Sequence, residues 1–118
     1  MKNQPFYRRL GFALHGIASA WRNEASFRTQ CCAALGVIAV LAWRRPALVW
    51  WVLLLMLCAM VLAAELFNSA LEAALDHLHP ERHEAIRIAK DCAAGAVLVL
   101  SLTSAAVFAA FLADSFAL

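Results

Sequence analysis

Residues 47–76 read ALVWWVLLLMLCAMVLAAELFNSALEAALD, an apolar run that passes directly into a segment with acidic and amide side chains. The first eighteen of these residues carry no charge. As a helix they rise about 27 Å, close to the roughly 30 Å thickness of a bilayer's hydrocarbon core. Because no proline or glycine interrupts the segment, we expect one helix that crosses the membrane and continues beyond it.

Two further apolar stretches, residues 29–43 and 92–113, flank this segment. The breaks between the stretches are short, since Pro46 and Pro80 each disfavour helix at the preceding residue. The sequence therefore predicts three membrane-spanning helices joined by tight connections. Their expected bounds are about 26–44, about 47–77 and about 81–114.

The composition indicates an all-α integral membrane protein with one domain, residues 1–118. Of the 118 residues, 64% are hydrophobic and 15% are charged, whereas soluble domains carry about 25% charged residues. A net charge of +2 is too dilute for phosphate neutralisation along a nucleic acid, so no nucleic-acid partner is expected. The four cysteines lie in apolar runs without metal-ligand spacing, which favours a packing role.

Residues 5–22 have a different periodicity, with apolar side chains on one helical face and polar side chains opposite. The pattern predicts an amphipathic helix at the membrane surface. A helix packed on the bundle is a compatible alternative. The apolar face consists of Phe6, Leu10, Leu14, Ile17 and Trp21, and the polar face of Arg8, His15, Ser19 and Arg22.

The positive charges are distributed unevenly about the predicted spans. Eight of the ten Lys and Arg residues precede the first span or lie between the second and third, while Arg44 and Arg45 follow the first. The positive-inside rule therefore places the N-terminus in the cytoplasm of a multi-pass protein.

A polar stripe follows the second apolar run. At about 100° per residue its members fall within an arc of about 100°. Glu65 stands at the edge of the hydrocarbon core, and Asp76 lies about 16 Å further along the helix. A carboxylate near the hydrocarbon costs a few kcal/mol unless it is partnered, which favours a functional role for Glu65. A solvated helix end remains the alternative, above all for Asp76. The stripe comprises Glu65, Asn68, Ser69, Glu72 and Asp76.

Other polar side chains are predicted at the same level. Glu24 stands where the surface helix meets the first span, and a mixed-charge face opens the third helix, formed by His83, Glu84, Arg87, Lys90 and Asp91. Carboxylates from separate segments suit Mg²⁺, which uses one or two of them together with phosphate oxygens and water. The sequence has no glycine-rich phosphate loop, so a nucleotide would be held by metal, basic side chains and helix ends.

These residues form motifs that resemble the small prokaryotic diacylglycerol kinase family, which includes undecaprenol kinases. The resemblance runs from about Arg9 to the end of the third span. Gln30 replaces an acidic residue of some members, and the family's N-terminal arginine aligns with Arg8 or Arg9. The motifs are Trp21-x-Asn23-Glu24-x-x-Phe27-Arg28, Glu65-Leu66-x-Asn68-Ser69-Ala70-Leu71-Glu72-x-x-x-Asp76, Glu81-x-His83 and Ala89-Lys90-Asp91-x-x-x-x-Ala96-Val97.

The resemblance implies a homotrimer in a bacterial inner membrane, with active sites between subunits, ATP as phosphate donor and Mg²⁺ as cofactor. It implies that Glu65 is the catalytic base for the lipid hydroxyl and that Glu24 and Glu72 hold the metal. The implied ATP contacts are Glu24, Glu72, Glu81, Arg82, His83, Lys90 and Asp91. The implied lipid contacts are Arg9, Trp21, Asn23, Glu65 and Asn68, with Asp76 and Arg28 in support.

The expected function is transfer of the γ-phosphoryl group of ATP to diacylglycerol, which gives phosphatidic acid, with undecaprenol as the alternative acceptor. A small proton-coupled exporter is a different possibility, but it would need a carboxylate near mid-bilayer and usually four spans. A non-enzymatic subunit or scaffold would not require Glu24, Glu65 and Glu72 to act together.

Overall fold

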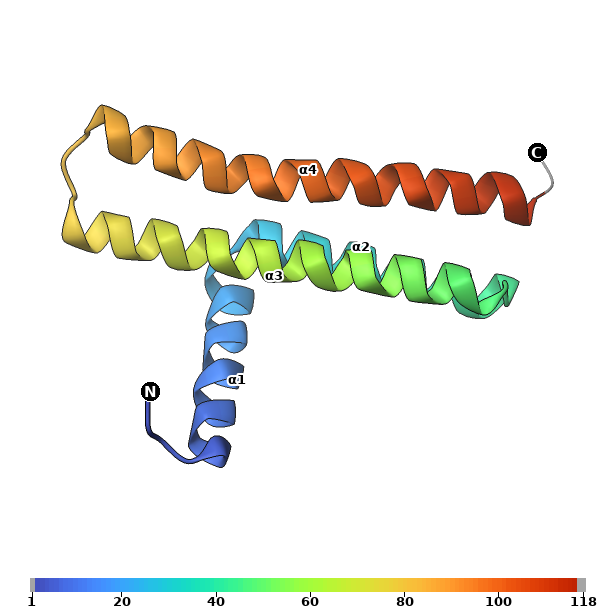
Figure 1. Cartoon of the computed structure of the whole chain (residues 1–118), viewed down its shortest axis with the longest axis horizontal. Helices are drawn as coiled ribbons and strands as arrows, with labels where there is room; N and C mark the ends of the chain where they lie inside the picture. The colour runs from blue at the N-terminus through green and yellow to red at the C-terminus, as the bar shows by residue number, and fades with distance from the viewer. Residues whose placement is uncertain (1, 117–118) are drawn as a thin grey trace.

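The computed structural model describes residues 2–116, and in that part of the chain all regular structure is helical. The helices are α1 (Phe6–Asn23), α2 (Ala25–Arg44), α3 (Leu48–Leu78) and α4 (Glu84–Ser115) (Figure 1). Of these, α2, α3 and α4 are long and apolar enough to cross a membrane. The predicted all-α fold with three spans and an N-terminal helix is therefore confirmed.

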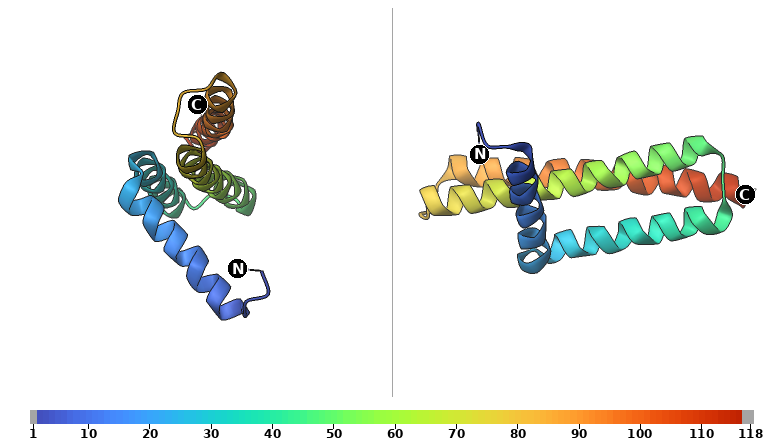
Figure 2. Two further views of the ribbon diagram at one scale, coloured as in Figure 1. Left: turned by 90° about the vertical axis from the view of Figure 1, so that its left-hand side faces the viewer. Right: turned by 90° about the horizontal axis from the view of Figure 1, so that it is seen from below.

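Helix α3 is the centre of the bundle, because it packs against both α2 and α4. The three helices lie along the long axis, and α1 runs across that axis (Figures 1 and 2). Since α2 is shorter than its neighbours, the hairpin of α3 and α4 extends past the point where α1 joins α2 (Figure 1). This extension carries Asp76, the far end of the polar stripe, beyond the start of α2.

The best-packed region lies at the end of the bundle away from α1. Leu41, Leu54 and Phe111 are fully or almost fully buried there, one from each spanning helix. The helix ends are also tied by polar contacts. Arg44 donates 2.7 Å hydrogen bonds to Oγ and the carbonyl of Ser115, and Trp50 Nε1 donates to Asp114 Oδ2 at 3.2 Å.

The two connections end the helices by different means. Arg45 adopts a left-handed conformation, φ 49°, and Pro46 follows it, so the chain reverses directly after α2. Between α3 and α4 the chain leaves the helix at His79, before Pro80, and α4 begins only at Glu84, three residues later than the sequence suggested. The reason is the cap at His83, whose side chain accepts a hydrogen bond from the backbone N–H of Ala85.

The apolar face of α1 is not packed against the bundle. Phe6 is 76% exposed and Leu14 is 56% exposed, while the buried residue of this helix is Ala20. The bundle therefore leaves the apolar face free for a lipid surface, which favours the interfacial location over packing alone.

We expect Phe111→Ala to lower the stability of the folded bundle by about 3 kcal/mol, because it removes a fully buried ring and leaves a cavity. Leu102→Ala is the matched control, since Leu102 lies on the same helix with its side chain 62% exposed. Thermal unfolding in detergent micelles measures both variants. Equal midpoints would show that the packed region contributes little to stability.

Candidate active site

The joint between α1 and α2 is fixed by Arg28. Its Nη1 donates to the carbonyl of Trp21 at 2.7 Å and to that of Arg22 at 3.2 Å. These carbonyls belong to the last turn of α1, where they have no partner within their own helix. Arg28 thus caps α1 from the first turns of α2. Glu24, with extended backbone between the two helices, is held at the corner.

Glu65 is the one charged side chain buried in the described residues, with 3% of its surface exposed. Its Oε2 accepts a 2.9 Å hydrogen bond from Ser26 Oγ, which reaches it from the start of α2. No lysine, arginine or histidine of residues 2–116 forms an ion pair with it. A buried carboxylate supported by one neutral donor is costly in structural terms, which is typical of a functional group.

The remaining stripe residues differ in their surroundings. Asn68 Oδ1 is enclosed and has no hydrogen-bond partner in the described part of the chain. Glu72 is partly buried and forms no ion pair within residues 2–116. Asp76 Oδ1 accepts a hydrogen bond from Lys90 Nζ, so it joins α3 to α4 beyond the end of α2. The stripe thus leaves an amide oxygen and a carboxylate available at its middle.

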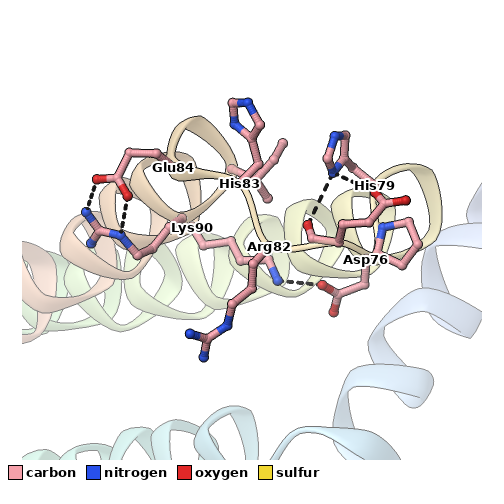
Figure 3. Close-up of a pocket in the computed structure, with 10 residues that line it drawn as sticks. Asp76, His79, Arg82, His83, Glu84 and Lys90 are labelled. Carbon is pink, nitrogen blue, oxygen red and sulfur yellow. Dashed lines mark hydrogen bonds and ion pairs between the residues drawn. The ribbon is translucent and has the colours of Figure 1, made fainter.

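The connection between α3 and α4 encloses an open cavity of about 400 Å³. Lys90 points across it toward Asp76, and Arg82 projects from its edge without an ion pair in the described residues (Figure 3). His79 Nδ1 lies 3.3 Å from Glu81 Oε2. The cavity therefore combines basic and acidic side chains just beyond the apolar bundle.

Arg87 is held along the outer side of α4. It donates to both carboxylate oxygens of Glu84 and, at 2.8 Å, to Asp91 Oδ2. The hydrogen bonds to Glu84, followed by the negative charge of Asp91, raise the pKa of Arg87 above its ordinary value. Arg87 thus remains a cation, and it engages the carboxylate of Asp91.

A second groove, of about 580 Å³, separates α1 from α3. Small side chains on both helices leave it open, among them Gly16, Ala70 and Ala73. Asn23 and Glu24 form its polar end, opposite α3. The groove and the cavity beside Lys90 have no lining residue in common.

The structure thus gathers some of the predicted site residues and separates others. Asp76, Glu81, Arg82, His83 and Lys90 share the cavity, and Asn23 and Glu24 share the groove. Arg9 and Trp21 are exposed on α1. Within residues 2–116 no three His, Cys, Asp or Glu side chains are grouped as a metal site. The sequence analysis did not identify Ser26. Ser26 is two residues after Glu24, which was expected at the same membrane depth as Glu65, and this shared depth was the signal that could have identified it.

The fold and the polar site at one end of the spans define a small multi-pass membrane protein whose ionisable side chains gather where the apolar bundle ends. Residues 11–112 match the family model described as prokaryotic diacylglycerol kinase. The chain belongs to the prokaryotic diacylglycerol kinase family. It is accordingly a kinase, for which ATP is the phosphate donor and a membrane lipid the acceptor. The exporter and scaffold alternatives are excluded.

Individual relatives agree with this assignment. The chain is 36% identical over 89 residues to a diacylglycerol kinase of Escherichia coli (strain K12), covering 75% of this chain and 73% of that protein. It is 33% identical over 88 residues to a diacylglycerol kinase of Haemophilus influenzae, with 75% of each chain covered. It is 29% identical over 99 residues to an undecaprenol kinase of Bacillus subtilis, covering 84% and 80%.

We expect Arg28→Ala to loosen the end of α1, because two hydrogen bonds from a charged donor are lost, with a local cost of about 1–3 kcal/mol. Hydrogen–deuterium exchange in micelles should become faster in residues 17–23 and stay unchanged in α4. Arg22→Ala is the control, since it removes a charge from the same joint without breaking a side-chain hydrogen bond. Unchanged exchange in Arg28→Ala would contradict the capping role.

Proposed function

We propose that this protein transfers the γ-phosphoryl group of ATP to the primary hydroxyl of diacylglycerol, which gives phosphatidic acid. The reaction takes place at the cytoplasmic face of a bacterial inner membrane. The observation that carries the proposal is Glu65, a buried carboxylate without a cationic partner, placed where the polar stripe leaves the apolar bundle. Undecaprenol, another lipid with a primary hydroxyl, is the alternative acceptor.

Glu65 serves as the general base. As the lipid oxygen bonds to the γ-phosphorus, its proton passes to Glu65, and the bond between the γ-phosphorus and the bridging oxygen breaks to release ADP. A base in hydrogen-bond reach of the hydroxyl contributes about 10²- to 10⁴-fold to such a step. Asn68 supports the lipid at the same level, and Asn23, Trp21 and Arg9 contact it from the side of α1.

Lys90 meets the phosphates of ATP. Its amine is paired with Asp76 in an open cavity, so the exchange of one exposed carboxylate for phosphate oxygens costs little desolvation. Arg82, which is exposed and free of ion pairs in the described residues, adds a second cation. Glu81 and His83, which line the cavity, complete the nucleotide contacts together with Asp91, the neighbour of Lys90 in sequence.

Glu24 and Glu72 hold Mg²⁺. Both are partly buried carboxylates at this end of the bundle, and neither is neutralised by an ion pair within residues 2–116. Oxygen donors of this kind, combined with phosphate oxygens, match the ligands that Mg²⁺ prefers. When bound, Mg²⁺ neutralises charge on the phosphates and aligns them for in-line transfer.

A homotrimer completes the site. In one chain the groove with Glu24 and the cavity with Lys90 are separate. The reaction, however, needs the metal ligand Glu24 and the cation Lys90 at the same phosphate group. Large apolar side chains of the spans are also exposed in the single chain, Met56 and Leu98 among them. A site shared by neighbouring subunits satisfies both observations.

The charge distribution supports the orientation. Glu65, Lys90 and Arg28 lie toward the end of the bundle that the positive-inside rule assigns to the cytoplasm, where ATP is available. Diacylglycerol is favoured over undecaprenol by the relatives. Identity is 36% to the diacylglycerol kinase of Escherichia coli and 29% to the undecaprenol kinase of Bacillus subtilis.

Purified protein in mixed micelles with radiolabelled ATP should phosphorylate diacylglycerol faster than undecaprenol, and the products are separated by thin-layer chromatography. Glu65→Gln should lower kcat by about 10²- to 10⁴-fold, because the base is lost while size and shape are kept. Thermal unfolding confirms that the variant is folded. Faster turnover of undecaprenol would reverse the substrate assignment. Wild-type turnover in Glu65→Gln would show that Glu65 is not the general base.

Glu24→Gln and Glu72→Gln should each raise the Mg²⁺ concentration for half-maximal activity by about tenfold, because a charged oxygen ligand becomes neutral. Asp114→Asn is the control at the far end of the bundle, and its metal titration should match that of the unmodified protein. If the titrations of both glutamate variants were also unchanged, these residues would not be metal ligands.

A further inference from the structure

We propose that Ser26 is a positioning residue for Glu65, a role that rests on the proposed function of Glu65 as the base. Ser26 Oγ donates to Glu65 Oε2 at 2.9 Å, across 39 positions of sequence and between two helices. This is the one hydrogen bond that the Glu65 carboxylate accepts from the described residues. The serine hydroxyl therefore sets the direction in which the carboxylate faces.

The two carboxylate oxygens have different roles in this arrangement. Oε2 is engaged by Ser26, whereas Oε1 accepts no hydrogen bond from residues 2–116. Oε1 is thus the oxygen that meets the lipid hydroxyl and accepts its proton, while Ser26 holds the carboxylate by the other oxygen.

The position of Ser26 on α2 strengthens the effect. Ser26 is the second residue of the helix, and Glu24 at the N-cap makes no side-chain cap hydrogen bond. The first backbone N–H groups of α2 therefore keep their partial positive charge near Glu65 Oε2. The Ser26 hydroxyl and the uncapped start of α2 therefore hold the carboxylate from the same side.

The same turn of α2 connects this contact with the rest of the site. Glu24 lies two residues before Ser26, and Arg28, two residues after it, anchors the turn to the end of α1. A shift of this turn would move a proposed metal ligand and the support of the base together. Ser26 itself is exposed, so its substitution removes a hydroxyl without opening a cavity in the core.

Steady-state kinetics on diacylglycerol micelles test the role. Ser26→Ala should lower kcat by about tenfold, because the base is no longer held in its reactive orientation, with the KM for MgATP within about twofold of wild type. Ser26→Thr restores a hydroxyl on the same backbone and should recover most of the loss. Thr29→Ala is the control, since the Thr29 hydroxyl bonds only the Ala25 carbonyl of its own helix.

A second readout does not depend on turnover. Hydrophobic carbodiimides modify membrane carboxyl groups, and mass spectrometry of the peptide containing Glu65 gives the rate. Without the Ser26 hydroxyl Oε2 is uncovered and the carboxylate is free to turn, so Ser26→Ala should label at least about twofold faster than wild type. Ser26→Thr and Thr29→Ala should label at the wild-type rate.

The outcomes separate this proposal from the proposed function. Wild-type kcat in Ser26→Ala, together with an inactive Glu65→Gln, would overturn the positioning role and leave the kinase mechanism intact. Failure of the unmodified protein to phosphorylate any lipid would overturn the proposed function instead. Labelling still decides the contact in that case, because equal rates in wild type and Ser26→Ala would show that Ser26 does not hold Glu65.

Discussion

The structure depends on the placement of one carboxylate at the edge of an apolar bundle. Glu65 follows eighteen uncharged residues, and the packing of α2 against α3 buries it to 3% exposure. In such surroundings a charge needs a donor, and Ser26 provides it at 2.9 Å. The contact constrains the rotation of α2 relative to α3, because it requires the side of α2 that carries Ser26 to face Glu65. The active-site chemistry and the helix packing therefore share one contact.

The joint between α1 and α2 belongs to the same region. Helix α1 lies across the bundle, as its exposed apolar face requires at a lipid surface (Figure 2). The last carbonyls of α1 have no partner within their own helix, and Arg28 on α2 donates hydrogen bonds to two of them. Three neighbouring side chains thus have different contacts: Glu24 lines the groove beside α1, Ser26 bonds the buried carboxylate of Glu65, and Arg28 caps the end of α1. The first turn of α2 therefore both anchors α1 and supports Glu65.

Much of the fold was predictable, because long uninterrupted apolar runs have few alternatives in a bilayer. The helices begin and end within a few residues of expectation except at His83, where a side-chain cap delays α4. The depth of Glu65 was also predictable, since it depends only on rise per residue. The pairing of Ser26 with Glu65 was not, because it joins residues 39 positions apart through the rotation of two helices. Periodicity within one helix contains no information about that rotation.

The two basic residues of α4 that form ion pairs, Arg87 and Lys90, differ in how easily they could change partners. Arg87 bridges Glu84 and Asp91 within its own helix, so its partners stay at hand whatever happens in the cavity. Lys90 instead reaches Asp76 on α3, and both ends of that pair border the open cavity. In the proposed site a polyphosphate, which carries more negative charge than one carboxylate, would compete with Asp76 for Lys90. The proposed contact of Lys90 with a nucleotide would therefore leave the hydrogen bonds of both helices intact.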